Sequence, residues 1–310
     1  MVGSSIARKF RDEKIEVFGK SSKELDFTNR EETFKELKNI SPDVLIIAAA
    51  KVGGIGANST YPVEFLTINL QLQTNLLDAA HAADIKKVIF LGSSCIYPKF
   101  APQPIPESSL LTGPLEPTNE PYAIAKISGV KLVDSYRKEY GRNWISLMPT
   151  NMYGPNDNFD IETSHVLPGL LHRFHVAKTT GQQEIRIWGD GTPLREFMHV
   201  DDLSSAVFHL LEIETGESLF NVGSSQEISI HDLAQLLART VGYKGQIAFD
   251  PEKPNGTPRK LLDSTLIKET GWKPRITLED GIKSVYDWYL NNYQEKVLYQ
   301  RDICLIELIL

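Results

Sequence analysis

The chain has 310 residues and a formal net charge of −7. At this length, one large domain or two joined domains can bury a core without disulfides or metal ions. Its content of 41% hydrophobic and 24% charged residues is typical of globular proteins. The acidic excess argues against nucleic-acid binding, because phosphates are neutralised by Lys and Arg.

Two cysteines occur, Cys95 and Cys304, and their separation fits neither a disulfide framework nor a metal site. The sequence contains no signal-peptide pattern and no run of 18 apolar residues. We therefore expect a cytoplasmic protein without bound metal and without a membrane segment.

Short apolar runs alternate with segments of helical period in the first half of the chain. Strands are predicted over residues 43–50, 87–92 and 144–148, and helices over 62–83 and 122–140. The strands are apolar throughout, as expected when helices cover both faces of a parallel sheet. The pattern predicts an α/β fold with a Rossmann-type doubly wound parallel sheet.

Beyond about residue 160 the elements become shorter, which predicts a smaller C-terminal α/β lobe. Loops are predicted at 188–193 and 254–258, and helices over 199–214, 230–241 and 278–293. We expect a Rossmann domain over residues 1–164, completed by about 199–225, and a mainly substrate-binding lobe over 165–310. The apolar segment 304–310 is too short to span a bilayer and is expected to form a packing or oligomer contact.

Tyr122 and Lys126 are four residues apart on a predicted helix and therefore share one face. A lysine ammonium beside a phenol favours the phenolate, which suits Tyr122 to give a proton to a carbonyl oxygen. Ser93 follows a strand, at the sheet edge where catalytic groups of open α/β folds gather. This serine, tyrosine and lysine resemble the triad of the short-chain dehydrogenases/reductases.

Five motifs make the resemblance more specific, and the chain resembles the GDP-L-fucose synthases over nearly its whole length. They are Leu91-Gly-Ser-Ser-Cys-Ile-Tyr-Pro-Lys99, Glu116-Pro-Thr-Asn-Glu-Pro-Tyr-Ala-Ile-Ala-Lys126, Pro149-Thr-Asn-Met-Tyr-Gly-Pro155, Trp188-Gly-Asp-Gly-Thr-Pro-Leu-Arg-Glu-Phe197 and Gly256-Thr-Pro-Arg-Lys-Leu-Leu-Asp263. The resemblance implies conversion of GDP-4-keto-6-deoxy-mannose to GDP-L-fucose with NADP(H), through epimerisation at C3 and C5 and reduction at C4. It also implies a homodimer.

The resemblance implies further site residues. Cys95 and His165 would serve as the acid and base of epimerisation, and both residue types can titrate near neutrality when perturbed. Substrate contacts would be Arg173, Trp188, Arg195 and Asn255, where Asn255 replaces an aspartate of the family. The implied cofactor-binding residues are Gly3, Ala49, Ala50, Lys51, Asn69, Leu91, Gly92, Ser93, Ser94, Lys126, Pro149, Thr150, Asn151, Met152 and His165.

The phosphate-binding loop is the main departure from the family. Its members begin with a strand and Gly-x-x-Gly-Met-Val-Gly, whereas this chain starts at Met1-Val-Gly3, so we expect the first strand and two glycines to be missing. Gly53-Gly-Ile-Gly56 is not expected to replace them, because the final glycine is lacking and no helix start is predicted there. By the same resemblance, the position where a basic residue often recognises a 2′-phosphate carries Ser22, with Lys20 and Lys23 beside it.

Two alternatives remain at this point. One is another NAD(P)-dependent sugar-nucleotide epimerase or dehydratase, although Ser94-Cys95 stands where dehydratases typically carry carboxylates. The other is an inactive, truncated homologue that dimerises.

Overall fold

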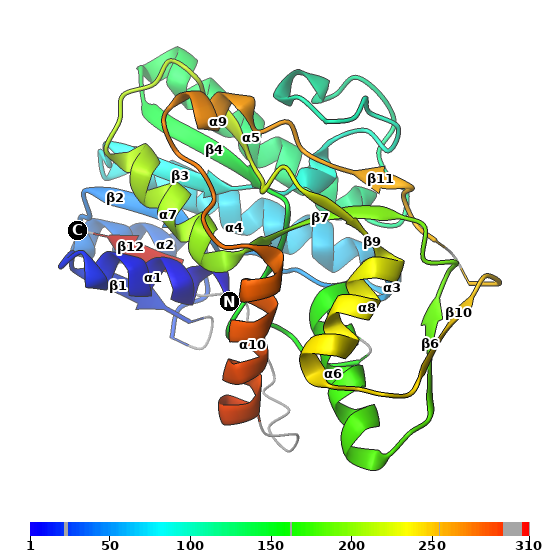
Figure 1. Cartoon of the computed structure of the whole chain (residues 1–310). Coiled ribbons are helices and arrows are strands. Elements are labelled where there is room, and N and C mark those ends of the chain that lie inside the picture. The colour runs from blue at the N-terminus through cyan, green and yellow to red at the C-terminus, as the bar shows by residue number, and fades with distance from the viewer. Residues whose placement is uncertain (22–23, 162, 254, 294–305, 310) are drawn as a thin grey trace.

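The computed structural model describes residues 1–21, 24–161, 163–253, 255–293 and 306–309. Its main sheet has six strands in the order β1 (Val17–Lys20), β12 (Ile306–Ile309), β2 (Val44–Ile47), β3 (Lys87–Leu91), β4 (Asn143–Pro149) and β8 (Leu219–Val222). Neighbouring strands from β2 to β8 are parallel. The predicted Rossmann-type sheet is confirmed (Figure 1).

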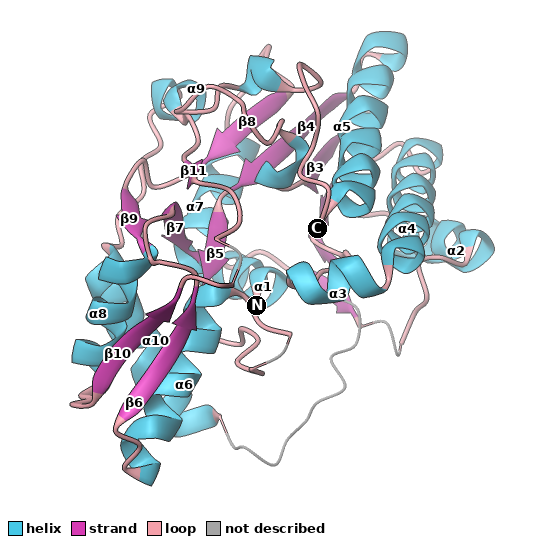
Figure 2. Cartoon of the chain, turned by 90° about the vertical axis from the view of Figure 1, so that its right-hand side faces the viewer, coloured by secondary structure: helices cyan, strands magenta, loops and turns pink. Residues whose placement is uncertain are grey.

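Helices cover both faces of this sheet (Figures 1 and 2). Ile46 and Ile89 share a core with α1 (Val2–Asp12) and α7 (Val200–Leu211). The alternate residues of β2 and β3 face a second core with α2 (Arg30–Ile40), α4 (Pro62–Ala82) and α5 (Glu120–Tyr140). Because successive strand residues point to opposite faces, this arrangement explains why the strands are apolar throughout.

A second lobe has its own core. It contains α6 (Val166–Thr180), β6 (Glu184–Trp188), α8 (Ile230–Val241), β10 (Gln246–Asp250) and α10 (Leu278–Asn292). A smaller sheet of β5 (Asn151–Tyr153), β7 (Leu194–His199), β9 (Glu227–Ser229) and β11 (Arg259–Lys260) lies beside it. The short helix α9 (Thr265–Glu269) follows β11 in the chain.

Most predicted elements are present, although α7 ends at Leu211 rather than at 214 and two further details differ. The predicted strand 43–50 ends earlier, because β2 stops at Ile47 and Ala48 N bonds back to Ile46 O. The expectation that no helix starts near Gly53–Gly56 is wrong. Helix α3 (Ile55–Thr60) begins directly after Gly54, whose carbonyl oxygen accepts bonds from the backbone and side-chain nitrogens of Asn58.

The C-terminal segment contributes the strand β12 to the main sheet. β12 is antiparallel to both neighbours, with Leu308 opposite Phe18 of β1 and Leu45 of β2. Cys304 lies outside the described residues. The expected packing contact is therefore a backbone pairing within the chain, at the sheet position between β1 and β2.

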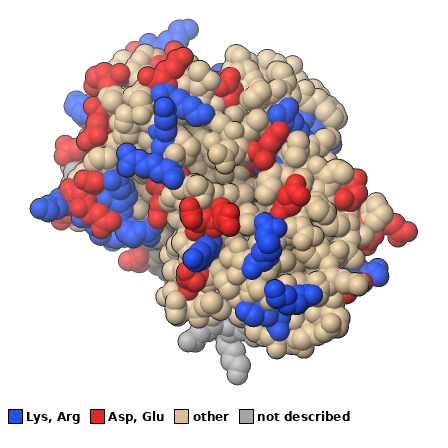
Figure 3. Space-filling view, in the orientation of Figure 1, with Lys and Arg blue, Asp and Glu red and all other residues tan. Residues whose placement is uncertain are grey.

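Two surface properties complete the description of the fold. Within the described residues, no helix has the length and apolar character needed to cross a membrane. On the face shown in Figure 3, basic and acidic side chains are interspersed.

Candidate active site

The carboxyl end of β3 carries the predicted catalytic residues. A short 3₁₀ turn, Ser94–Ile96, follows the strand, and Ser93 Oγ accepts a bond from Cys95 N at 3.3 Å. Helix α5 packs tightly on the strand at Gly129. A Cβ at this position would lie only 2.4 Å from Phe90 Cζ, so a larger side chain would not fit there. This close packing brings Lys126, one turn earlier on α5, to the end of β3.

Lys126 links the helix to the strand end. Its side chain is buried, and its ammonium donates to Leu91 O at 2.8 Å. The same nitrogen lies 5.9 Å from the ring centroid of Tyr122, in the first turn of α5. Phe65 meets the Tyr122 ring edge-on at 6.4 Å. The structure therefore brings Ser93, Tyr122 and Lys126 to one edge of the sheet.

Cys95 is buried and is a free cysteine. Burial raises the pKa of its thiol, while Lys260 and, to a smaller extent, Lys126 act to lower it. Burial thus works against the thiolate form of Cys95, and the two lysines work in its favour. The physical reason is that an apolar enclosure disfavours the thiolate.

The loop after β2 is held by Asn69. This buried side chain accepts a bond from Lys51 N at 2.9 Å and donates to Lys51 O at 3.0 Å. The Lys51 ammonium pairs with Glu64. Ala49 and Ala50, which precede this clamp, are buried. Asn69 thereby fixes the backbone of the loop that follows β2.

The segment after β4 lies at the same carboxyl end of the sheet as Ser93, because β4 runs parallel to β3. Thr150 N donates to Val222 O at 3.0 Å, and Asn151 Nδ2 donates to Glu196 O at 2.7 Å. The Glu196 carboxylate accepts bonds from Ser225 N and Leu262 N. Pro149 to Met152 are thus fixed by bonds to β7 and β8.

The first turn of α1 provides backbone amides that could contact a phosphate. Met1 is the N-cap of this helix and makes no side-chain capping bond, and Gly3 is buried. Uncapped N–H groups and the helix dipole favour an anion at this position. Lys20 pairs with Glu36 at 3.5 Å, and the predicted 2′-phosphate position at Ser22 and Lys23 lies outside the described residues.

His165 lies on the second lobe, as the exposed N-cap of α6. A Cβ on Gly54 would lie 3.3 Å from Ser164 O, so the segment before His165 reaches the loop that follows β2. None of the contacts described for the chain joins His165 to Cys95. Cys95 follows β3 of the main sheet, whereas His165 precedes α6 of the second lobe.

The four predicted substrate residues gather around the end of β6. Arg173 donates to Arg186 O, while Trp188 ends the strand with 69% of its surface exposed. Asn255 Oδ1 accepts a bond from Asp190 N at 2.9 Å. A Cβ on the neighbouring Gly256 would lie 3.4 Å from Arg195 Nη2. The four residues that the resemblance assigns to substrate binding thus lie close to one another.

Lys260 is a residue that the sequence interpretation missed. It pairs with Arg195 in the parallel β11–β7 ladder, and its charge interacts with both Arg195 and Cys95. The motif Gly256–Asp263 already contained this lysine. Its position at the site depends on strand pairing, which the motif alone does not give.

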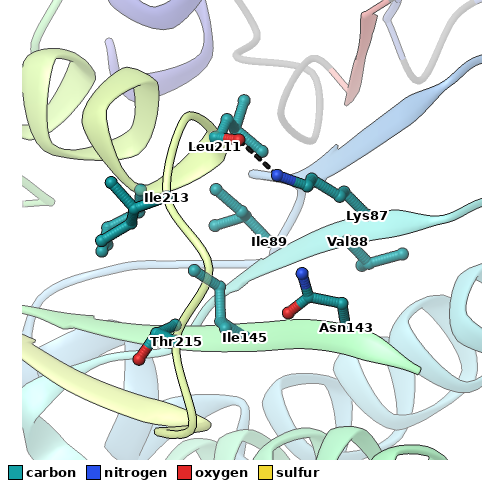
Figure 4. Close-up of a pocket in the computed structure, with 9 residues that line it drawn as sticks. Lys87, Val88, Ile89, Asn143, Ile145, Leu211, Ile213 and Thr215 are labelled. Atoms are coloured by element: carbon teal, nitrogen blue, oxygen red, sulfur yellow. Dashed lines mark hydrogen bonds between the residues drawn. The ribbon is translucent and has the colours of Figure 1, made fainter. Parts of the chain in front are cut away.

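Two pockets lie away from the predicted catalytic residues. The small pocket in Figure 4 is lined by Lys87, at the opposite end of β3 from Ser93, and by Leu211, whose carbonyl accepts from Lys87. A groove between α7 and residues 271–276 is lined by Phe208 and Trp272. Neither includes a predicted catalytic residue. Among the described residues, no cluster of His, Cys, Asp and Glu suits a metal ion.

The NAD dependent epimerase/dehydratase family matches residues 1–223. GDP-L-fucose synthase 1 of Arabidopsis thaliana is 53% identical over 293 residues, which cover 94% of this chain and 91% of that protein. GDP-L-fucose synthase of Escherichia coli is 48% identical, with 94% of each chain covered. The chain belongs to the GDP-L-fucose synthases of this family.

A solved structure of the same family has a similar fold. A GDP-L-fucose synthetase of Naegleria fowleri bound to NADP has a TM-score of 0.85 at 29% identity, covering 94% of this chain and 90% of that one. The family assignment and the fold therefore agree over most of the chain.

Proposed function

We propose that this chain converts GDP-4-keto-6-deoxy-mannose to GDP-L-fucose with NADPH, by epimerising C3 and C5 and then reducing the C4 ketone. The observation that carries the proposal is the placement of Cys95 beside Ser93 and the Tyr122–Lys126 pair at the end of β3. The GDP-L-fucose synthase relatives, about half identical to it, support the same activity.

Epimerisation uses the acidity of the carbons beside the C4 ketone. A base removes the proton from C3 or C5, and the electrons of the broken C–H bond move to the C4 oxygen. An acid on the opposite face then returns a proton to that carbon. Cys95 and His165 are the proposed pair, because the resemblance assigns them these roles and they stand on different lobes. Ser93 and Tyr122 are the proposed hydrogen-bond donors to the charged C4 oxygen.

For reduction, NADPH supplies the hydride when it is bound. Tyr122 gives a proton to the C4 oxygen, and Ser93 holds that oxygen by a hydrogen bond. Lys126 keeps the helix in register with β3 through its bond to Leu91 O. Its ammonium also favours the phenolate that remains on Tyr122.

The residues present fit the cofactor along one edge of the sheet. The uncapped first turn of α1 suits its phosphates, and the clamped backbone at Lys51 suits close contact with it. The proposed cofactor-binding residues are Gly3, Ala49, Ala50, Lys51, Asn69, Leu91, Gly92, Ser93, Ser94, Lys126, Pro149, Thr150, Asn151, Met152 and His165.

The second lobe is proposed to bind the GDP part of the substrate. Arg173 and Arg195 suit a diphosphate, and burial lowers the pKa of both guanidinium groups without removing their charge. The exposed ring of Trp188 suits stacking. Asn255 differs from these three, because its Oδ1 already accepts from Asp190 N. The proposed division is a cofactor domain over 1–164, completed by about 199–225, and a substrate lobe over 165–310.

We also propose a cytoplasmic homodimer. Val63 and Ile124, at the starts of the adjoining helices α4 and α5, are 69% and 42% exposed. Apolar side chains on neighbouring helices suit a contact with a second copy. The free thiol of Cys95 suits a reducing compartment. Light scattering during size exclusion would test the dimer, and a single-chain mass would refute it.

The activity is tested with purified protein, GDP-4-keto-6-deoxy-mannose and NADPH. NADPH absorbance should fall, and NMR should identify GDP-L-fucose as the product. Oxidation of NADPH with retention of the C3 and C5 configurations would instead identify a simple 4-reductase. Absence of any turnover would refute the proposed function.

A further inference from the structure

The loop that follows β2 lies against the turn that precedes His165. A Cβ on Gly54 would lie 3.3 Å from Ser164 O and 3.6 Å from Thr163 O. The backbone of Gly54, with φ −66° and ψ 177°, is one that any residue can adopt. Glycine is therefore favoured here by the closeness of Ser164 O and not by the backbone conformation.

A second glycine packs against the side chain of Ser164. Gly169 is buried in α6, and a Cβ there would lie 2.5 Å from Ser164 Oγ. Gly169 N also donates to His165 O at 3.0 Å, in the first turn of the helix. The loop after β2 thus approaches the carbonyl of Ser164, and α6 approaches its hydroxyl.

The turn that carries Ser164 is fixed by its own hydrogen bonds. Ser164 N donates to Asp160 O at 3.1 Å, and Thr163 N donates to Asp160 Oδ1 at 2.9 Å. Asn158 Nδ2 donates to Thr163 Oγ1 at 2.9 Å. Side chains of this type stabilise a turn by bonding to backbone two or three residues away. A displacement at Ser164 O is therefore passed on to His165, the next residue.

Gly54 is also fixed, on the side of the cofactor loop. Its carbonyl oxygen accepts bonds from Asn58 N at 3.1 Å and from Asn58 Nδ2 at 3.0 Å, and Asn58 is buried. Three residues earlier, the two bonds from Asn69 fix the backbone of Lys51. A side chain added at Gly54 would therefore displace Ser164 more readily than the loop itself.

We propose that Gly54 is a positioning residue for His165, because its lack of a side chain lets the turn before α6 lie against the loop that follows β2. Gly169 contributes in the same way from within α6. This inference rests on the proposed function, in which His165 transfers a proton during epimerisation. Proton transfer needs donor and acceptor within hydrogen-bond reach, and a misplacement of about 1 Å can lower a rate about a hundredfold. Reduction uses groups on β3 and α5, so it should depend much less on this contact.

The experiment compares Gly54→Val with a matched control, Gly56→Val. A Cβ on Gly56 would have nothing within 4 Å, although this glycine lies only two residues further along the same segment. Solvent-deuterium incorporation at C3 and C5 should fall about tenfold to a hundredfold in Gly54→Val. Its product should shift from GDP-L-fucose towards the GDP-6-deoxy-sugar with the original configurations. Gly56→Val should match the parent in both measurements.

NMR of the His165 ring measures its position without any turnover. Its resonance is assigned by its absence from His165→Gln, and it should move in Gly54→Val but not in Gly56→Val. Gly54→Ala is the second variant should Gly54→Val fail to fold. Its methyl group requires Ser164 to move by only a few tenths of an ångström, so both effects should be smaller but in the same direction.

Gly169→Ala tests the contact with α6. Its methyl group would collide with Ser164 Oγ, so deuterium incorporation should fall in this variant as well. Adding Ser164→Ala removes that oxygen and should restore the rate. A defect that persists unchanged in the double variant would exclude a role for this contact.

The possible outcomes separate this inference from the proposed function. If the parent makes no GDP-L-fucose but the His165 resonance still moves in Gly54→Val, the proposed function fails and the placement of His165 by Gly54 stands. If the parent is active and epimerisation is the same in Gly54→Val and Gly56→Val, the positioning role is overturned. A proportional loss of both products in Gly54→Val would indicate a merely structural role and would overturn it too.

Discussion

The Lys126 ammonium donates to Leu91 O at 2.8 Å and lies 5.9 Å from the ring centroid of Tyr122. One side chain thereby fixes the helix that carries the tyrosine against the strand that carries Ser93. This buried bond adds to the close packing of Gly129 on Phe90, and both help to place Tyr122 and Ser93, which come from different elements.

Replacing Tyr122 by Phe removes the hydroxyl and keeps the ring that packs against Phe65. Reduction at C4 should fall about a hundredfold or more, because the proton donor is lost. Tyr140→Phe, on the exposed end of the same helix, is the control. NADPH oxidation under saturating substrate measures the effect. A rate within threefold of the parent would refute the role of Tyr122.

Replacing Asn69 by Leu leaves the amide and the carbonyl of Lys51 without their partner. The free energy of unfolding should fall by about 2 kcal/mol, since two partly buried polar groups lose their hydrogen bonds. NADPH affinity should weaken, because the backbone of Lys51 is a proposed cofactor contact. Asn291→Leu, whose bond to Asp287 O lies on an exposed helix end, is the control. Equal NADPH affinity in the two variants would contradict the proposed contact.

Replacing Leu308 by Pro removes a backbone N–H from a strand with neighbours on both sides. The free energy of unfolding should fall by about 3 kcal/mol, because proline disrupts the interior of a sheet. Leu308→Ala keeps the N–H and serves as the control. Thermal unfolding measures both, and a proline variant as stable as the alanine variant would show that the β12 pairing contributes nothing.

Glu196 allows a prediction about pH. Burial raises the pKa of its carboxyl above the ordinary value of 4.5. Such a group contributes stability that is fully present below the unfolded value and is lost as the pH rises through the folded one. The stability of Glu196→Gln relative to the parent should therefore improve as the pH rises above about 4.5. Chemical denaturation at several pH values measures this difference, and a constant difference would refute the shift.

The sequence predicted what depends on local pattern. Helix α8 matches its predicted range, 230–241, because its apolar residues recur at helical spacing. The Tyr122–Lys126 pair was predicted for the same reason. The β12 pairing and the place of Lys260 were not predicted, since both depend on strands that meet from distant parts of the chain. The burial of Cys95 was not predicted either, because it is set by tertiary packing.

Cys95→Ala separates epimerisation from reduction. If Cys95 exchanges the protons at C3 and C5, the variant should lose epimerisation by about a hundredfold to ten-thousandfold, the range of general acid-base assistance. Hydride transfer relies on Tyr122 and Lys126, so part of it should remain. The variant would then release a GDP-6-deoxy-sugar with the original configurations at C3 and C5.

Product NMR and solvent-deuterium incorporation at C3 and C5 measure this outcome. Cys95 is buried, so its loss should also lower stability somewhat, by an amount that thermal unfolding records. Cys95→Ser is the companion variant. Its hydroxyl is similar in size to the thiol but holds its proton far more tightly. Both variants should fail at epimerisation if the thiol transfers the proton. Normal GDP-L-fucose with normal deuterium uptake from Cys95→Ala would show that Cys95 only fills space beside Ser93.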